Sequence, residues 1–234
     1  MVTVLSLGGS IVAPDRVDEA FLKAFVTLLE ELWSGDAERR FIFVVGGGGP
    51  ARAWQNAYRA VAASLGAPVG NDAADWIGVM ATRLNAQLVK AIMGDRCREA
   101  VVIDPEEAPL TSLAESRVLV AAGWKPGFSS DYDAVVLAER FGAAQVINLS
   151  NIEQVYTDDP RCNPNAKPID RISWHDFRAL VGDEWVPGKN VPFDPVASAR
   201  AEKSGLTVIC AAGRNLENLK KLLEGKPFLG TTIK

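Results

Sequence analysis

The sequence predicts an α/β protein whose open, mostly parallel sheet of about eight strands lies between two layers of helices. Two observations predict this class: short apolar runs alternate with longer segments of helical periodicity, and glycine-rich turns follow two of the runs. Strands that are buried on both faces have such nearly continuous apolar sequences. Because ligands of open parallel sheets bind at the carboxyl ends of the strands, the glycine turns mark the expected site.

The clearest stretch is Phe41–Arg52, in which five apolar residues precede four glycines, a proline and an arginine. The apolar run predicts a buried strand, and Gly46–Gly49 allow the backbone to come close to a ligand. Pro50 suits the first turn of a helix, and Arg52 places a cation beside the positive helix end. Such a turn can serve packing alone, but the arginine favours an anion site, most often for a phosphate.

A second glycine turn follows the expected first strand, Val2–Leu7, and consists of Gly8, Gly9 and Ser10. The alternation then continues with short connections and no internal repeat or linker, which predicts one domain of two lobes that share a sheet. Further strands are expected at 100–103, 118–120, 145–149, 206–210 and 230–233, and the Asp-, Asn- and Pro-rich segment 155–169 predicts a hairpin or loop. Helices are expected at 17–33, 50–65, 131–142, 174–181, 195–204 and 215–223, with another that ends near 93 and is capped by Asn71 or Asp72.

The composition is that of an ordinary globular protein, with 234 residues, 48% apolar residues, 23% charged residues and a net charge of −4. This balance gives no reason to expect nucleic acid or an anionic membrane as a partner, and no apolar run is long enough to span a membrane. Three widely spaced cysteines, Cys97, Cys162 and Cys210, predict reduced thiols in a cytoplasmic protein. The single histidine, His175, excludes a histidine-rich metal site, and we expect no metal ligands among the side chains.

The glycine spacing excludes two common nucleotide motifs, because neither GxxxxGK[ST] nor GxGxxG occurs. Two anion-sized turns in one sheet still indicate two phosphate-bearing ligands or one long ligand. Phosphoryl transfer needs this arrangement, since donor and acceptor must be held in line with hydrogen-bond donors around the moving group.

The loop before the helix at 131–142 combines a lysine, two hydroxyls and an acid. Ser129, Ser130 and Asp131 can cap that helix, but capping accounts for only one of them and not for Lys125 ahead of it. Such a loop can bind phosphate oxygens, so capping and catalysis both stay open. Asp133 is expected to be a first-turn acid that the helix dipole favours.

Two further sets of residues have an equally open interpretation. Tyr156 and Asp159 suit a base-stacking ring and an acceptor for ribose hydroxyls, or they form a polar turn with one packed tyrosine. Lys125 and Lys189 lie in Gly- and Pro-containing loops and are the lysines best placed to meet a γ-phosphate.

Taken together, these stretches resemble the amino acid kinase family and, within it, the archaeal-type uridylate (UMP) kinases. The resemblance runs nearly end to end through motifs in the same order: LSLGGS, VVGGGGPAR, DWIGVMATRLNA, KPGFSSD, LAERFGA, SNIEQVYTDDP, NPNAKPI, FDPVASARAEKSG and GTTI. It implies a carbamate kinase-like fold, transfer of the ATP γ-phosphoryl to UMP, Mg²⁺ that enters with ATP, and a homo-oligomer that is typically a hexamer.

The resemblance also implies roles for individual residues in two lobes, an acceptor lobe at about 1–143 and an ATP lobe at about 144–234. The implied ATP contacts are Gly8, Gly9, Ser10, Gly48, Arg52, Ser150, Tyr156 and Asp159. The implied UMP contacts are Gly47, Asp75, Lys125, Pro126, Gly127, Phe128, Ser129, Ser130 and Asp131. The implied catalytic groups are Arg52, Lys125, Asp131 and Lys189.

Departures from the family pattern keep two alternatives open. Ser6 replaces a lysine found in many members and favours the archaeal subgroup, whereas Glu153-Gln154, Trp124-Lys125 and the segment WVPGKN change the surroundings of both substrates. The alternatives are a nucleotide- or oxyanion-binding or storage protein on the same fold, and a kinase of another small phosphate or carboxylate. An isopentenyl phosphate kinase is disfavoured, because Arg52 follows the second glycine turn where that group places a histidine.

Overall fold

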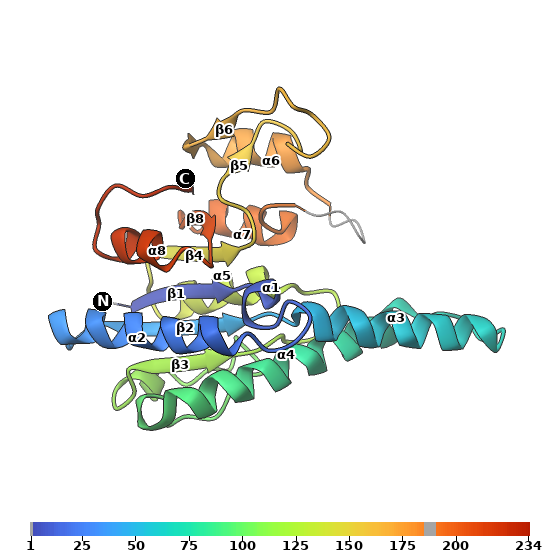
Figure 1. Cartoon of the computed structure of the whole chain (residues 1–234), viewed down its shortest axis with the longest axis horizontal. Coiled ribbons are helices and arrows are strands. Elements are labelled where there is room, and N and C mark those ends of the chain that lie inside the picture. The colour runs from blue at the N-terminus through green and yellow to red at the C-terminus, as the bar shows by residue number, and fades with distance from the viewer. Residues whose placement is uncertain (1, 185–190) are drawn as a thin grey trace.

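The computed structural model describes residues 2–184 and 191–234 and consists of a central sheet with helices on both faces (Figure 1). The main sheet has the strand order β3-β2-β1-β4-β8-β9-β7, and β5 pairs with β6 in a separate two-stranded sheet. The bounds are β1 (Val2–Leu7), β2 (Arg40–Val45), β3 (Val118–Ala121), β4 (Gln145–Ser150), β5 (Val155–Tyr156), β6 (Pro168–Ile169), β7 (Arg171–Ile172), β8 (Thr207–Ala212) and β9 (Thr231–Ile233).

The strands β3, β2, β1, β4 and β8 run parallel, and β9 reverses direction against β8. This confirms the mostly parallel sheet and the expected hairpin, since β5 and β6 pair antiparallel. The main sheet has seven strands in place of about eight, and the expected strand at 100–103 is wrong. That segment makes only one isolated bridge, Val102 to Ala121, because Asp104 and Pro105 end the apolar run directly after it.

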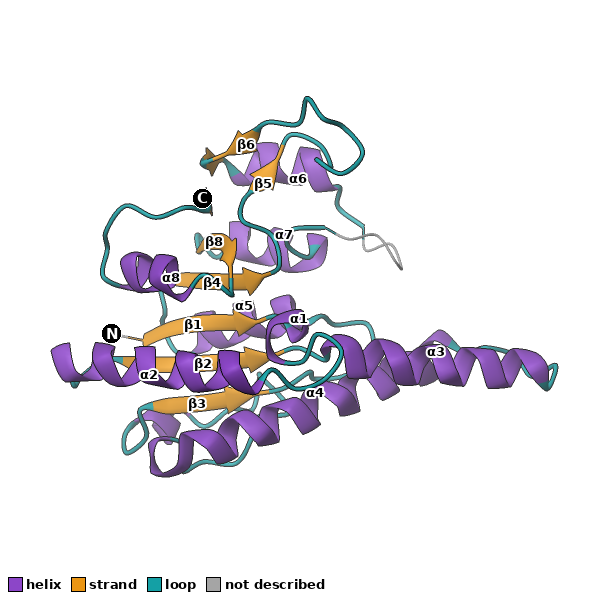
Figure 2. Ribbon diagram, viewed as in Figure 1, coloured by secondary structure: helices purple, strands orange, loops and turns teal. Residues whose placement is uncertain are grey.

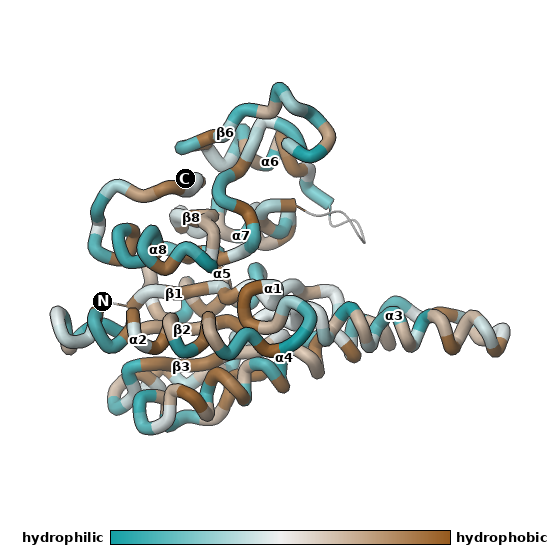
Figure 3. The backbone as a smooth tube through the Cα atoms, viewed as in Figure 1, coloured by the Kyte–Doolittle hydropathy of each residue, from teal (hydrophilic) through white to brown (hydrophobic). Residues whose placement is uncertain are grey.

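Helices cover both faces of the sheet, as Figure 2 shows. The helices α2 (Glu19–Gly35), α4 (Asn71–Met93) and α8 (Leu216–Leu223) pack on one face, and α5 (Ser130–Arg140), α6 (Trp174–Val181) and α7 (Pro195–Lys203) pack on the other. Shorter turns are α1 (Gly9–Val12) and the 3₁₀ segments Gly94–Arg96 and Leu110–Leu113. Two apolar cores result, one on each face, and Figure 3 shows the apolar residues concentrated along the strands.

Capping explains where several helices begin. Asp18, Ser173, Asp194 and Asn215 each accept a backbone N–H from the first turn of the helix that follows. The expected cap of α4 is wrong, because Gly70 is its N-cap and Asn71 already lies inside the helix.

The helix α3 (Gly48–Ser64) and the first half of α4 form an antiparallel arm that projects beyond the sheet (Figure 1). Within α3 only Gly49 and Ala62 are buried. Large apolar side chains are exposed along the arm: Trp54, Val61, Leu65, Val69, Trp76, Met80 and Leu84. Single exposed apolar residues are normal on a surface, whereas large exposed apolar patches mark interaction sites, so the arm is a candidate for such a site.

One sheet spans both halves of the chain, because β1 from the first half pairs with β4 from the second. Across residues 2–184 and 191–234, no helix combines the length and apolar character needed to cross a membrane.

Candidate functional site

Three polar side chains lie in a row across neighbouring strands of the sheet. Ser6 on β1 is in register with Asn148 on β4, and Asn148 is in register with Cys210 on β8. All three are buried, and they face the layer of α5 and α7, because their alternate neighbours Val4, Val146 and Val208 belong to that core. The row lies toward the carboxyl ends of the strands, where a ligand site is expected.

The carboxylate of Asp131, in the first turn of α5, lies over this row. Its Oδ1 accepts a hydrogen bond from Ser6 Oγ at 3.3 Å, and its Oδ2 accepts one from the backbone N–H of Asp194 at 3.2 Å. Burial and, secondly, the charge of Asp194 raise the pKa of Asp131 to about 7. Asp131 therefore joins β1, α5 and the start of α7 through one carboxyl group.

Asp133 lies two residues after Asp131 in the first turn of α5 and is fully buried. Its Oδ2 accepts the backbone N–H of Trp124 at 3.1 Å, and its Oδ1 has no hydrogen-bond partner within the described residues. Burial is the main cause that raises the pKa of Asp133 to about 7, and the charges of Asp131 and Asp104 add to it. The expectation of a simple first-turn acid is therefore incomplete, because this carboxylate holds a loop.

The two glycine turns pack directly against each other. A Cβ added to Gly9 would lie 1.9 Å from the nitrogen of Gly48, and one added to Gly46 would lie 2.5 Å from the nitrogen of Gly9. Gly48 also has a φ of +64°, which L side chains rarely adopt. Packing therefore requires glycine here, as the packing interpretation of the sequence held.

The same turns also present unpaired donors. Gly8 N–H donates to Leu149 and Gly46 N–H to Leu7, but the N–H groups of Gly9, Ser10, Gly47 and Gly48 meet no acceptor in the part of the chain that the structure describes. These four residues are partly exposed and begin α1 and α3. Unpaired amides at two adjoining helix starts form a cradle of the kind that suits an anion. The packing interpretation is therefore confirmed, and the ligand interpretation stays a prediction.

The loop at 123–129 closes the site on the α5 side. The ring of Phe128 lies 4.8 Å from that of Trp124 and 4.7 Å from that of Tyr132, and the Lys125 ammonium lies 3.6 Å from the centre of the Trp124 ring. Ser129 is the N-cap of α5 and accepts from Tyr132 N–H, so the capping role predicted for this cluster is confirmed for Ser129. Pro126, Gly127 and Ser130 belong to the same loop and helix start, and Gly127 has a φ of +83°.

Several residues predicted for the site have other contacts. Arg52 is exposed and donates to the carbonyl of Pro14 at 3.1 Å, beside the turn that begins at Gly8. Asp75 is half-buried on the arm. Asp159 forms an ion pair with Arg161 at 2.8 Å, which fits the polar-turn alternative.

Ser150 is the last residue of β4, and its carbonyl accepts a hydrogen bond from Gly213 N–H at 2.8 Å. One neighbouring strand is β1, which leads into the glycine turn at Gly8. Tyr156 lies on the separate β5–β6 sheet, on the far side of β4 and β8 from β3 (Figure 1). Lys189 lies outside the described residues.

The sequence interpretation missed other residues of the site, among them Asn148, Asp194, Thr82 and Asn85. Asn85 Nδ2 donates to the carbonyls of Gly46 and Gly47, and Thr82 Oγ1 accepts from Gly123 N–H at 2.7 Å. A signal existed for Asn148, which is a polar residue inside an apolar strand, and for Asp194, which precedes a proline at a helix start. The partners of Thr82 and Asn85 are distant in sequence, so no local pattern marks them.

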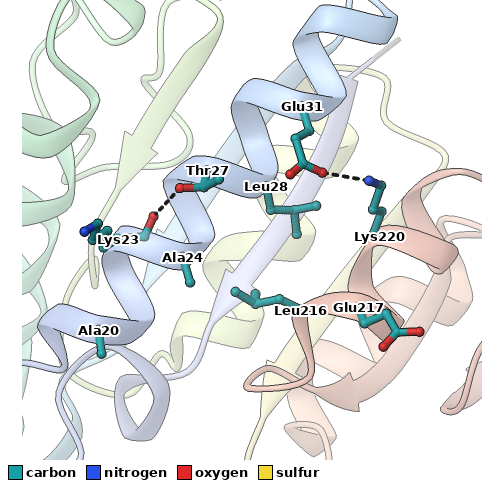
Figure 4. Close-up of a pocket in the computed structure, with 9 residues that line it drawn as sticks. All are labelled: Ala20, Lys23, Ala24, Thr27, Leu28, Glu31, Leu216, Glu217 and Lys220. Carbon is teal, nitrogen blue, oxygen red and sulfur yellow. Dashed lines mark hydrogen bonds and ion pairs between the residues drawn. The ribbon is translucent and has the colours of Figure 1, made fainter.

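A surface groove between α2 and α8 is a separate feature (Figure 4). Leu28 and Leu216 form its apolar floor, and an ion pair of Lys220 with Glu31 at 2.7 Å closes one side. It contains none of the residues predicted for catalysis.

The comparisons with known proteins agree with this geometry. The model of the amino acid kinase family matches residues 1–212. The chain belongs to the amino acid kinase family. It is 35% identical to the uridylate kinase of Methanospirillum hungatei over 98% of this chain and 93% of that protein, and 32% identical to the uridylate kinase of Pyrococcus abyssi over 98% of both. The crystal structure of uridylate kinase from Archaeoglobus fulgidus superposes with a TM-score of 0.81 at 32% identity, with complete coverage of both chains.

Replacing Gly9 by alanine is expected to destabilise the protein by about 1–3 kcal/mol, because the new Cβ overlaps the backbone of Gly48. The matched control is Gly35→Ala, where an added Cβ meets nothing within 4 Å and alanine is the better helix former. Urea unfolding of both variants measures the difference. Equal stability of Gly9→Ala and the wild type would contradict the close packing of the turns.

The two raised carboxyl pKa values predict that stability falls as pH rises from about 4 to about 7. In this window the unfolded chain has already lost protons that the folded Asp131 and Asp133 retain, since their pKa rises from 3.8 to about 7 on folding. The decline in the free energy of unfolding is on the order of a few kcal/mol, because one pKa unit corresponds to about 1.4 kcal/mol. Denaturant unfolding at several pH values checks this, and Asp133→Asn should flatten the decline. An identical pH profile in that variant would refute the assignment to Asp133.

Proposed function

We propose that the chain is an ATP-dependent nucleoside monophosphate kinase that converts UMP and MgATP into UDP and ADP, a step of pyrimidine nucleotide synthesis. The observation that carries the proposal is the pair of adjoining glycine turns with four unpaired amides, next to the Asp131 carboxylate. Relatives named uridylate kinase align with 98% of this chain at more than 30% identity, which supports UMP as the acceptor.

The proposed mechanism is electrostatic. An oxygen of the UMP phosphate attacks the γ-phosphorus of MgATP, and the bond from that phosphorus to the bridging oxygen breaks, leaving ADP. Phosphate is already a competent nucleophile, so no general base is needed, and the amides of Gly9, Ser10, Gly47 and Gly48 stabilise the charge on the moving group. Asp131 orients the cations and the amide-bearing turns around it.

The cationic groups of the mechanism are Arg52, Lys125 and Lys189. Arg52 lies on α3 four residues after Gly48, and its guanidinium donates to the carbonyl of Pro14 close to the turn at Gly8–Ser10, which supports a role on the donor side of the cradle. Lys125 is exposed in the loop at 123–129, which we call the acceptor loop. Mg²⁺ enters as part of the substrate MgATP. This agrees with the usual coordination of Mg²⁺, which is commonly held by substrate phosphates and water.

The two nucleotides are assigned to opposite sides of the cradle. On the acceptor side, at about 1–143, UMP meets Gly47, Asp75 and the residues from Lys125 to Asp131. On the ATP side, at about 144–234, the adenine nucleotide meets Ser150, Tyr156 and Asp159, with Gly8, Gly9, Ser10 and Gly48 over its phosphates. The Asp159 carboxylate binds Arg161 through both oxygens, and a ribose hydroxyl would donate to its remaining acceptor position or displace the arginine.

Assembly and location complete the proposal. The exposed apolar side chains of the α3–α4 arm support a homo-oligomer, with the hexamer as the expected state. Cys97, Cys162 and Cys210 are free thiols, which supports a reducing compartment such as the cytoplasm.

The first test is coupled ADP release with MgATP against UMP, CMP, dUMP, AMP, isopentenyl phosphate, carbamate and acetylglutamate. UMP-dependent turnover well above the others is expected. Turnover with a different member of the panel would overturn UMP as acceptor, and ATP binding without any turnover would favour the binding or storage alternative.

Arg52→Ala is expected to lower turnover at least tenfold, since the lost charge-assisted contacts are worth about 1.4 kcal/mol or more. Arg171→Ala is the control, because Arg171 is exposed on the edge strand β7 and its side chain makes no hydrogen bond or ion pair within the described residues. Unchanged turnover in folded Arg52→Ala protein would remove this arginine from the mechanism.

Trp54→Glu is expected to reduce the mass in solution, because Trp54 is 70% exposed on the arm and a charge there opposes burial between subunits. Light scattering after size-exclusion chromatography measures the mass. Leu110→Glu is the matched control, since Leu110 is 63% exposed but lies away from the arm. A wild-type monomer, or an unchanged oligomer in Trp54→Glu, would contradict the arm as the interface.

A further inference from the structure

Side chains bind all four backbone polar groups of the dipeptide Gly123-Trp124, at the start of the acceptor loop. Gly123 N–H donates to Thr82 Oγ1 at 2.7 Å, and Trp124 N–H donates to Asp133 Oδ2 at 3.1 Å. Arg83 Nη2 donates to the carbonyl of Trp124 at 2.8 Å, and Arg83 Nε lies 3.5 Å from the carbonyl of Gly123. Loop backbone is usually hydrated, so this degree of fixation by two separate helices indicates a loop that has to be held in place.

Burial of the Asp133 carboxyl group costs free energy. It is fully buried and one of its oxygens has no hydrogen-bond partner within the described residues. Burial of a carboxylate with an unsatisfied oxygen is unfavourable, and an apolar residue of similar size in such a place is often neutral or stabilising. The stability of the fold therefore gives no reason for an acid at this position. The hydrogen bond that Asp133 accepts from the Trp124 N–H does give a reason, because it holds the loop.

The Trp124 peptide controls where Lys125 lies. The ammonium of Lys125 is 3.6 Å from the centre of the Trp124 ring and 5.2 Å from that of Phe128. Because a cation held on an aromatic face follows that ring, fixing the Trp124 backbone also fixes the cation of the acceptor loop. The far end of the loop is held by Ser129, which caps the same helix that contains Asp133.

One turn of α4 connects this loop to the glycine cradle. Thr82 and Arg83 bind the loop, and Asn85 binds the carbonyls of Gly46 and Gly47 at 2.9 and 3.1 Å. A single helical turn therefore sets the distance between the acceptor loop and the cradle. A group can act on the reaction through such spacing without touching the substrate.

We infer that Arg83 and Asp133 are positioning residues, which grip the Trp124 peptide from its carbonyl and its amide side and thereby set Lys125 and the start of α5 for the acceptor phosphate. The inference rests on the proposed function for the identity of the acceptor. The grip itself is a property of the substrate-free chain and can be measured without turnover.

The test compares Asp133→Val, Asp133→Asn, Arg83→Ala and the control Arg171→Ala. Asparagine retains an oxygen that accepts the Trp124 N–H, whereas valine fills the space without an acceptor. In substrate-free protein, amide hydrogen exchange of segment 123–129 is expected to rise at least tenfold in Asp133→Val and Arg83→Ala, with no change in β2. Asp133→Asn and Arg171→Ala should exchange like the wild type.

The kinetic readout separates positioning from a general loss of structure. The KM for UMP is expected to rise about tenfold in Asp133→Val and Arg83→Ala, with the KM for ATP within twofold of the wild type. Asp133→Val should show this rise although its thermal stability equals or exceeds that of the wild type. Unchanged exchange in both variants, or parallel increases of both KM values with lost stability, would overturn the inference.

The outcomes for the two proposals are distinguishable. If the wild type does not use UMP but the exchange of 123–129 rises as expected, the proposed function is wrong and the grip on Trp124 stands. If the wild type uses UMP and the exchange does not change, the function stands and the grip is refuted.

Discussion

The arrangement of the site depends on one carboxylate, that of Asp131. It accepts hydrogen bonds from two segments that are far apart in the sequence. Ser6 lies 125 residues before it and Asp194 lies 63 residues after it, yet both donate to the same side chain. The bond to Asp194 fixes the start of α7 over the sheet, and the bond to Ser6 fixes the start of α5. The halves of the chain meet at this group, and the cradle of unpaired amides from the two glycine turns lies at the same edge of the sheet.

The electrostatics of this edge differ from those of the surrounding surface. Elsewhere the backbone N–H of Phe21 and, secondly, Arg214 lower the pKa of Asp18, and hydrogen bonds from Arg200 and Ser204 outweigh burial and lower the pKa of Glu139. Asp131 and Asp133 instead lie two residues apart on one helix with little solvent, and burial raises both pKa values to about 7. Perturbed carboxyl groups of this kind are concentrated at functional sites. The charge that the protein holds there is therefore sensitive to what binds beside it.

Local signals were sufficient to predict most of the elements. The strand at Val2–Leu7 and the helix at Trp174–Val181 appear with the predicted bounds, because apolar runs and helical periodicity are visible in a short window. The predicted segment 100–103 failed as a strand, since Asp104 and Pro105 end the run directly after the single bridge that Val102 makes to the edge strand β3. The glycine turns were correctly singled out, but their mutual contact requires the parallel register of β1 and β2, which no sequence window contains.

The side-chain contacts of the site were harder to predict for the same reason. Ser6 stood out only as a departure from a pattern, and its partner became visible when α5 was placed on the sheet. Thr82 and Asn85 occupy ordinary helical positions, and only the packing of α4 against two loops gives them a role. Asp159 has a partner that is local in sequence. Its carboxylate forms an ion pair with Arg161, which is only two residues away.

The mutual packing of Gly9, Gly46 and Gly48 limits how such a protein can diverge. None of the three can acquire a side chain unless the opposite turn moves, so these positions have to be inherited together. Sequence change is left to positions whose side chains belong to the neighbouring loop, such as Trp124 and Lys125. A lineage could therefore alter the loop that we assign to the acceptor while the backbone of the two glycine turns stays the same.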